Sequence, residues 1–170
     1  MQTDAFRKEK DSLGTKNVPE NVYYGVQTLR AAENFNITGL TMHSEIINSL
    51  AYIKKAAAIT NCEVGLLDKT IANAIVTACN EILEGKFHEH FIVDPIQGGA
   101  GTSLNMNANE VIANRGNEIA GAKLLHPNDD INMSQSSNDT FPTAMHIAAV
   151  FMIEDRLIPA VETLIATFKR

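Results

Sequence analysis

Residues 144–153 are apolar on almost every side when they are placed at helical spacing, and few folds can accommodate such a segment. His146 is the exception in this stretch. A helix that is apolar all round needs a large core or an oligomer to cover it, because a small domain cannot do so alone. The helical pattern then continues from Leu157 to Arg170. We therefore expect this sequence to be part of a longer chain.

Apolar residues at helical spacing elsewhere predict a mainly α protein. Ser44 and Asp68 are the expected N-caps of two long helices, which Gly65 and Gly85 should end. The turn-rich first 36 residues predict an irregular arm with a short hairpin. The sequence contains no repeat or linker, so we expect one domain over residues 1–139 and the start of a second over 140–170. Helices are expected over residues 28–34, 44–62, 68–84, 104–118 and 140–170.

Composition excludes several classes of partner. The net charge of −6 argues against binding to a nucleic-acid backbone, and the absence of Trp disfavours base stacking. There is no uncharged apolar stretch of about 18 residues and no secretory signal, which predicts no membrane contact. Two cysteines, Cys62 and Cys79, fit a reducing compartment, so we expect a cytoplasmic protein. A chain of 170 residues can bury about 70% of its unfolded surface and so has its own core.

Two segments carry hydroxyl and amide groups at expected helix starts. The first, residues 98–110, has three glycines followed by Thr102 and Ser103, and the second, residues 134–139, reads Ser-Gln-Ser-Ser-Asn-Asp. Glycine lets the backbone approach a ligand, and a helix N-terminus favours an anion. Asn105 shares a helix face with the residue four positions on. Two neutral, donor-rich helix starts suit a small substrate with two carboxylates.

Capping is the simpler interpretation of the same two segments, because Ser, Thr, Asn and Gly are common at helix N-termini and in turns. The glycines do not form a P-loop, since no Lys follows in the required place, and no strand-rich repeat supports a dinucleotide fingerprint. Residues 126–130 combine a His with two carboxylates, but their spacing is poor for a metal site. Arg30 can clamp a carboxylate, although a surface ion pair is its default role.

Taken together, these motifs resemble the fumarase/aspartase superfamily of lyases, and most closely its aspartate ammonia-lyase branch. The resemblance covers nearly the whole chain from about Asp11 onward. Residues 23–31 and 98–107 look like the aspartase branch, whereas Asp130 and Ser137 look more like fumarases. A class II fumarase is therefore the alternative enzyme, and a non-catalytic helical oligomerisation module is the alternative outside enzymes.

The resemblance implies the N-terminal domain of this helical lyase fold over residues 1–139, with the start of its central helix bundle over 140–170. It implies reversible deamination of L-aspartate to fumarate by anti-elimination through an aci-carboxylate, in a homotetramer and without metal or organic cofactor. The family's catalytic Gly-Ser-Ser loop does not occur here, so this chain alone should be inactive and contain no catalytic residue. The implied substrate-binding residues are Thr102, Ser103, Asn105, Ser136, Ser137 and Asn138, with a secondary anion site at His126, Asn128 and Asp129.

Overall fold

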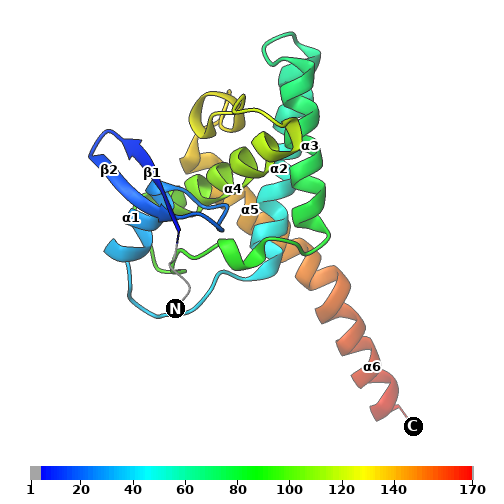
Figure 1. The fold of residues 1–170 in the computed structure, drawn as a ribbon. Coiled ribbons are helices and arrows are strands. Elements are labelled where there is room, and N and C mark those ends of the chain that lie inside the picture. The colour runs from blue at the N-terminus through cyan, green and yellow to red at the C-terminus, as the bar shows by residue number, and fades with distance from the viewer. Residues whose placement is uncertain (1–4, 170) are drawn as a thin grey trace.

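The computed structural model describes residues 5–169, which form a hairpin and six helices (Figure 1). The expectation of a mainly α protein is confirmed, and the long helices lie close to their predicted ranges. Short single turns at His88–His90, Gly99–Gly101 and Pro127–Ile131 connect the longer elements. The strands are β1 (Phe6–Asp11) and β2 (Gly14–Pro19), and the helices are α1 (Val26–Asn34), α2 (Ser44–Glu63), α3 (Lys69–Leu83), α4 (Thr102–Ala120), α5 (Ser137–Met152) and α6 (Ile158–Phe168).

The ends of α2 and α3 follow the predicted signals with one correction. The Asp68 carboxylate caps α3 by accepting a hydrogen bond from the Thr70 N–H at 2.7 Å. Gly65 and Gly85 follow α2 and α3 with φ values of +78° and +87°, which glycine adopts without steric cost. The prediction of Ser44 as the cap of α2 was wrong. His43 is the N-cap, and its Nδ1 accepts from the Glu45 N–H.

The core lies where α2, α3, α4 and α5 pack together. Leu50 of α2, Ile75 of α3 and Val111 of α4 are at most 1% exposed. In Figure 1, α2 and α3 run side by side and α4 crosses them. Each fully buried side chain of this size contributes about 1.5–3 kcal/mol. This packing fixes the starts of α4 and α5, which carry the hydroxyl segments.

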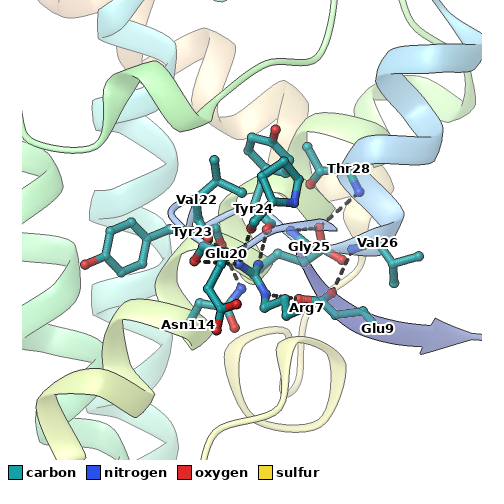
Figure 2. A network of polar contacts seen from close by, with 12 residues as sticks. Arg7, Glu9, Glu20, Val22, Tyr23, Tyr24, Gly25, Val26, Thr28 and Asn114 are labelled. Carbon is teal, nitrogen blue, oxygen red and sulfur yellow. Dashed lines mark hydrogen bonds and ion pairs between the residues drawn. The ribbon is translucent and has the colours of Figure 1, made fainter. Parts of the chain in front are cut away.

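Arg7 of β1 holds the arm in place (Figure 2). Its guanidinium donates to the carbonyl oxygens of Pro19, Val22 and Tyr24 at 2.7, 2.8 and 2.6 Å. The arm also contacts α4, because the Asn114 amide donates to the carbonyl of residue 23 at 2.7 Å. The hairpin itself was predicted, but this arginine clamp was not.

The C-terminal part of the chain extends away from the body as a helical arm (Figure 1). The prediction of one helix over 140–170 was wrong in detail. α5 begins at Ser137, a π-helical turn (Ile153–Leu157) separates it from α6, and Pro159 lies in the first turn of α6. His146 is exposed rather than buried in a core, and residue 170 lies outside the described residues. No helix within residues 5–169 has the length and apolar character needed to cross a membrane.

Candidate functional site

A turn of left-handed residues precedes α4. Gly99, Ala100 and Gly101 have φ values of +66°, +50° and +86°, a conformation that L side chains rarely adopt. A Cβ on Gly101 would lie 2.0 Å from the ring of Phe141 in α5. Glycine at position 101 therefore lets the start of α4 pack directly against α5.

The two hydroxyl segments meet in space. Thr102 Oγ1 lies 3.2 Å from Ser137 Oγ, although the two residues are 35 positions apart in the sequence. Thr102 donates its own hydroxyl hydrogen to the Gly99 carbonyl at 2.6 Å, so it accepts a hydrogen bond from Ser137. The structure thus brings these two helix starts together.

Fewer backbone donors are free at these helix starts than we expected. The Thr102 N–H donates to the Gly99 carbonyl, and the Leu104 N–H donates to Gln97 Oε1 at 2.7 Å. At α5 the Ser136 hydroxyl accepts from the Asn138 N–H, which is ordinary capping. The Ser136 hydroxyl hydrogen is still available to a ligand.

Five polar side chains at the two helix starts are accessible. Ser136 and Asn138 are exposed, and Thr102, Ser103 and Ser137 are half-buried. Among residues 5–169, nothing hydrogen-bonds to the side chains of Ser103 and Asn138. We define these five residues as the hydroxyl–amide cluster. Its donors are neutral and lie on two helix starts, so it can bind an anion without a cation of its own.

Asn105 occupies a different place from the rest of the predicted set. Its side chain is fully buried, so it faces the interior and not the accessible cluster. Its Oδ1 accepts from the Lys54 ammonium at 2.7 Å, and its Nδ2 donates to Asn132 Oδ1 at 3.0 Å. Any role for Asn105 in binding is therefore exerted through the residues beneath the cluster.

Lys54 is the centre of this buried network. Besides Asn105, its ammonium donates to Asn132 Oδ1 at 3.1 Å and to Gln135 Oε1 at 2.9 Å. Burial of the cation lowers its pKa to about 7, because a charge is poorly solvated in the interior. A lysine whose pKa lies near neutrality changes its charge with small changes in its surroundings.

Sequence reasoning missed Lys54, although a signal for it was present. In α2 the buried residues recur as Ile47, Leu50, Lys54 and Ala58, at the three- and four-residue spacing of a helix face. A lysine on that face must be buried and therefore needs partners. Its partners, however, come from distant segments, and the sequence gives no indication of them.

The secondary set of predicted residues lies around a separate cavity of about 450 Å³. His126, Asn128 and Arg30 line it together with Lys10. Arg30 is already paired, since its guanidinium donates to both carboxylate oxygens of Asp11 at 2.8 and 3.2 Å. Its default role as an ion-pair partner is thus present in the structure.

Asp129 belongs to the secondary set but does not line this cavity. Its carboxylate lies 3.1 Å from Nδ1 of His126, on an exposed turn. Within the described part of the chain, no group of three His, Cys, Asp or Glu side chains is placed to hold a metal ion. The turn at residues 126–130 therefore offers no such cluster.

Comparison with known proteins assigns the family. A family model described as "Lyase" matches residues 14–170, which is most of the chain. The chain belongs to the fumarase/aspartase superfamily. Within this superfamily it is 56% identical over 170 residues to the aspartate ammonia-lyase of Bacillus subtilis, covering 97% of this chain and 36% of that protein.

Fumarases of the same superfamily are nearly as similar. The class II fumarate hydratase of Nitrosomonas europaea is 51% identical over 166 residues, covering 95% of this chain and 36% of its own length. A crystal structure described as a fumarate lyase:delta crystallin from Brucella melitensis superposes with a TM-score of 0.93 at 46% identity, covering 96% of this chain and 40% of that one. The chain thus spans little more than a third of the curated relatives it matches.

Proposed function

We propose that the full-length protein is an aspartate ammonia-lyase, which reversibly deaminates L-aspartate to fumarate and ammonia. The observation that carries the proposal is the contact between Thr102 and Ser137, which joins two neutral, donor-rich helix starts. The 56% identity to the aspartate ammonia-lyase of Bacillus subtilis supports the choice of substrate. Both carboxylates of aspartate need hydrogen-bond donors, and the hydroxyl–amide cluster supplies them.

In the proposed reaction a base removes the proton beside one carboxylate, giving an aci-carboxylate, and ammonia then leaves from the opposite side. Charge develops on the carboxylate oxygens in this step, so donors aimed at them lower the barrier. We assign this role to Thr102, Ser103, Ser136, Ser137 and Asn138. These donors are neutral, so the donors themselves carry no charge that would need balancing before the substrate binds.

The base itself is not assigned to a residue of this chain. We propose that it and the remaining substrate contacts come from other segments of the protein, in a homotetramer whose sites combine several subunits. The apolar side chains of α5 and α6, such as Leu164 at 53% exposed and Phe168 at 81%, are consistent with further helices packing there. Residues 140–170 would then begin the central helix bundle, and residues 1–139 would form the N-terminal domain in the cytoplasm.

We further propose that His126, Asn128 and Asp129 form a secondary anion site at the cavity that His126 and Asn128 line together with Arg30. Asn128 is exposed and can donate to a carboxylate. This assignment is independent of the hydroxyl–amide cluster.

A class II fumarase is the second candidate. The residues that favour it are Asp130 and Ser137, and the Nitrosomonas europaea fumarate hydratase is 51% identical. A fumarase would add water to fumarate in place of ammonia, using the same carboxylate contacts. The two candidates therefore differ in the leaving group and not in the anion site.

The absorbance of fumarate distinguishes the two candidates when L-aspartate and L-malate are each given to the full-length protein. We expect rapid formation of fumarate from L-aspartate and poor turnover of L-malate. The 170-residue chain assayed alone should give no turnover, because we assign the general base and the remaining substrate contacts to other segments. General-base and electrostatic contributions to the rate are each worth orders of magnitude. Faster turnover of L-malate would assign the protein to the fumarases, and turnover of neither would reject the lyase proposal.

A further inference from the structure

Lys54 is a buried cation whose partners are all neutral. It is 1% exposed, and no carboxylate among residues 5–169 forms an ion pair with it. Its three donors meet three amide oxygens, from Asn105, Asn132 and Gln135. The hydrogen-bonding capacity of the ammonium is therefore satisfied, but its charge is not balanced.

The same lysine connects the two halves of the hydroxyl–amide cluster. Asn105 lies in the first turn of α4, three residues after Thr102, while Asn132 and Gln135 lie just before Ser136. Lys54 comes from α2, a third element that packs against both α4 and α5. Its position therefore links the start of α4 to the start of α5 from beneath.

Asn132 completes this link. Its Oδ1 accepts from Lys54, Asn105 and Asn109 at 3.1, 3.0 and 3.2 Å, and its Nδ2 donates to the Gln135 carbonyl at 3.0 Å. The turn that presents Ser136 is thus shaped by the side chain that accepts from the ammonium. A change in the charge of Lys54 acts directly on that turn.

The charge of Lys54 lies close to the N-terminal ends of two helices. The N-terminal ends of α4 and α5 are the positive ends of helix dipoles, so the cation lies beneath a region that is already positive. Such an arrangement is unfavourable in the free protein and becomes favourable when an anion binds above it. A dicarboxylate carries two negative charges and fits this requirement.

We propose that Lys54 is a positioning residue, which holds the two hydroxyl-bearing helix starts together and whose charge is balanced by the dicarboxylate that they bind. This inference rests on the proposed function, and it adds a coupling between substrate and proton. Near neutral pH part of the Lys54 population is uncharged, so binding of the dianion takes up a proton. If the dianion binds more tightly when Lys54 is protonated, linkage requires that the bound dianion raises the protonated fraction of Lys54 by the same factor.

Other titratable groups near Lys54 do not account for such uptake. Cys79 of α3 is the titratable group whose charge acts on it, and burial raises the pKa of that thiol to about 12, so it stays neutral. The contacts from α4 and from residues 132–135 are amides. Glu110 of α4 instead contacts the backbone of residues 25–28.

Isothermal titration calorimetry of the full-length protein tests the coupling. Succinate is the probe, because it is a dicarboxylate that cannot undergo the elimination. Titrations in buffers of different ionisation enthalpy give the number of protons taken up per site across pH 6–9. We expect an uptake of a substantial fraction of a proton near pH 7 in the wild type, and its loss in Lys54→Met. Lys55→Met is the matched control, since Lys55 bonds to Asn80 outside the network, and should keep the uptake.

Steady-state kinetics with L-aspartate gives a second readout. In Lys54→Met we expect KM to rise at least about tenfold near pH 7, because an opposite charge typically shifts a pKa by one to three units. The fall in kcat should be smaller than the rise in KM. The wild type should also bind aspartate more weakly as the pH rises above 7, whereas the KM of the variant should not follow this trend.

Asn132→Asp covers the case in which Lys54→Met does not fold. The new carboxylate pairs with the ammonium and keeps it charged in the free protein, so succinate should no longer cause proton uptake. Wild-type protein that turns over aspartate, with an uptake unchanged in Lys54→Met or in Asn132→Asp, would overturn the inference about Lys54. Wild-type protein without turnover of aspartate or malate would overturn the proposed function instead.

Discussion

Two buried charges, Glu110 and Lys54, are stabilised in different ways. Glu110 is 3% exposed, and its carboxylate accepts from the backbone N–H groups of Gly25, Gln27 and Thr28 at 2.8, 2.9 and 3.0 Å. Lys54 is 1% exposed and donates to three side-chain amides. Neither forms an ion pair within residues 5–169.

The two charges differ in which parts of the chain their hydrogen-bond partners come from. Glu110 caps the start of α1, so its partners belong to one short segment and its charge meets the positive end of a helix. Lys54 joins side chains from two segments, the first turn of α4 and the turn before α5, and its charge lies behind positive helix ends. Burial raises the pKa of Glu110 and lowers that of Lys54, and in Glu110 the three N–H donors oppose the effect of burial. We infer that Glu110 serves stability and Lys54 serves binding.

The largest expected effect is on stability, in Glu110→Ala. Removal of the carboxylate leaves three N–H groups at the start of α1 without partners, at a cost on the order of 3–5 kcal/mol. Thermal unfolding of the full-length protein at a fixed concentration measures the loss. Glu63→Ala is the matched control, because Glu63 is exposed at the end of α2. Equal unfolding temperatures for the two variants would show that Glu110 is not a structural cap.

Gly101→Ala tests the packing of the start of α4 against α5, which lies above Lys54. In Gly101→Ala the new Cβ lies 2.0 Å from the Phe141 ring, so α4 and α5 must separate, at a cost of about 3 kcal/mol. Gly65→Ala has a similar positive φ with nothing within 4 Å of the Cβ, so it isolates the backbone cost of about 1 kcal/mol. Unfolding temperatures and the KM for aspartate measure the two contributions. We expect only Gly101→Ala to raise KM, and an unchanged KM would contradict the role of this contact.

The two charges should also give opposite dependences of stability on pH. The pKa of Lys54 is lowered from 10.5 to about 7, so the unfolded state binds its proton more tightly between these values. Stability therefore rises with pH in that window, by up to about 1.4 kcal/mol per pH unit. The pKa of Glu110 is raised above 4.5, so Glu110 has the opposite effect on stability. Its contribution to the free energy of unfolding is lost as the pH rises above 4.5.

Unfolding of the wild type, Lys54→Met and Lys55→Met from pH 7 to 10 tests this dependence. The unfolding free energy of the wild type minus that of Lys54→Met should increase with pH. Lys55→Met should follow the wild type. A constant difference would mean that the lysine is charged throughout the window.

Local sequence signals predicted much of the fold. The spacing of Leu50 and Ile75 with their apolar neighbours, and the cap at Asp68, belong to single helices and can be seen in a linear sequence. The π-helical turn before Pro159 was missed because apolar periodicity continues across it. The cap of α2 was misassigned by one residue, since histidine is an uncommon N-cap.

The candidate site was only partly predictable. The segments that carry Thr102 and Ser137 were identified from their residue types and from the resemblance to a lyase family, and the structure places them in contact. The network of Lys54, Asn105, Asn132 and Gln135 depends on three segments brought together by packing, which no local pattern encodes. The roles of these residues in binding substrate stay predictions.

The most direct test of the account is the effect of Thr102→Ala and Asn138→Ala on kcat/KM for L-aspartate in the full-length protein. We expect Thr102→Ala to lower kcat/KM about 10²-fold, as for the loss of an oxyanion donor, and Asn138→Ala to lower it as well. Thr60→Ala and Asn73→Ala are matched controls at exposed positions of α2 and α3, and should leave kcat/KM unchanged. Kinetics of both site variants equal to those of their controls would remove the hydroxyl–amide cluster from the active site and contradict the account.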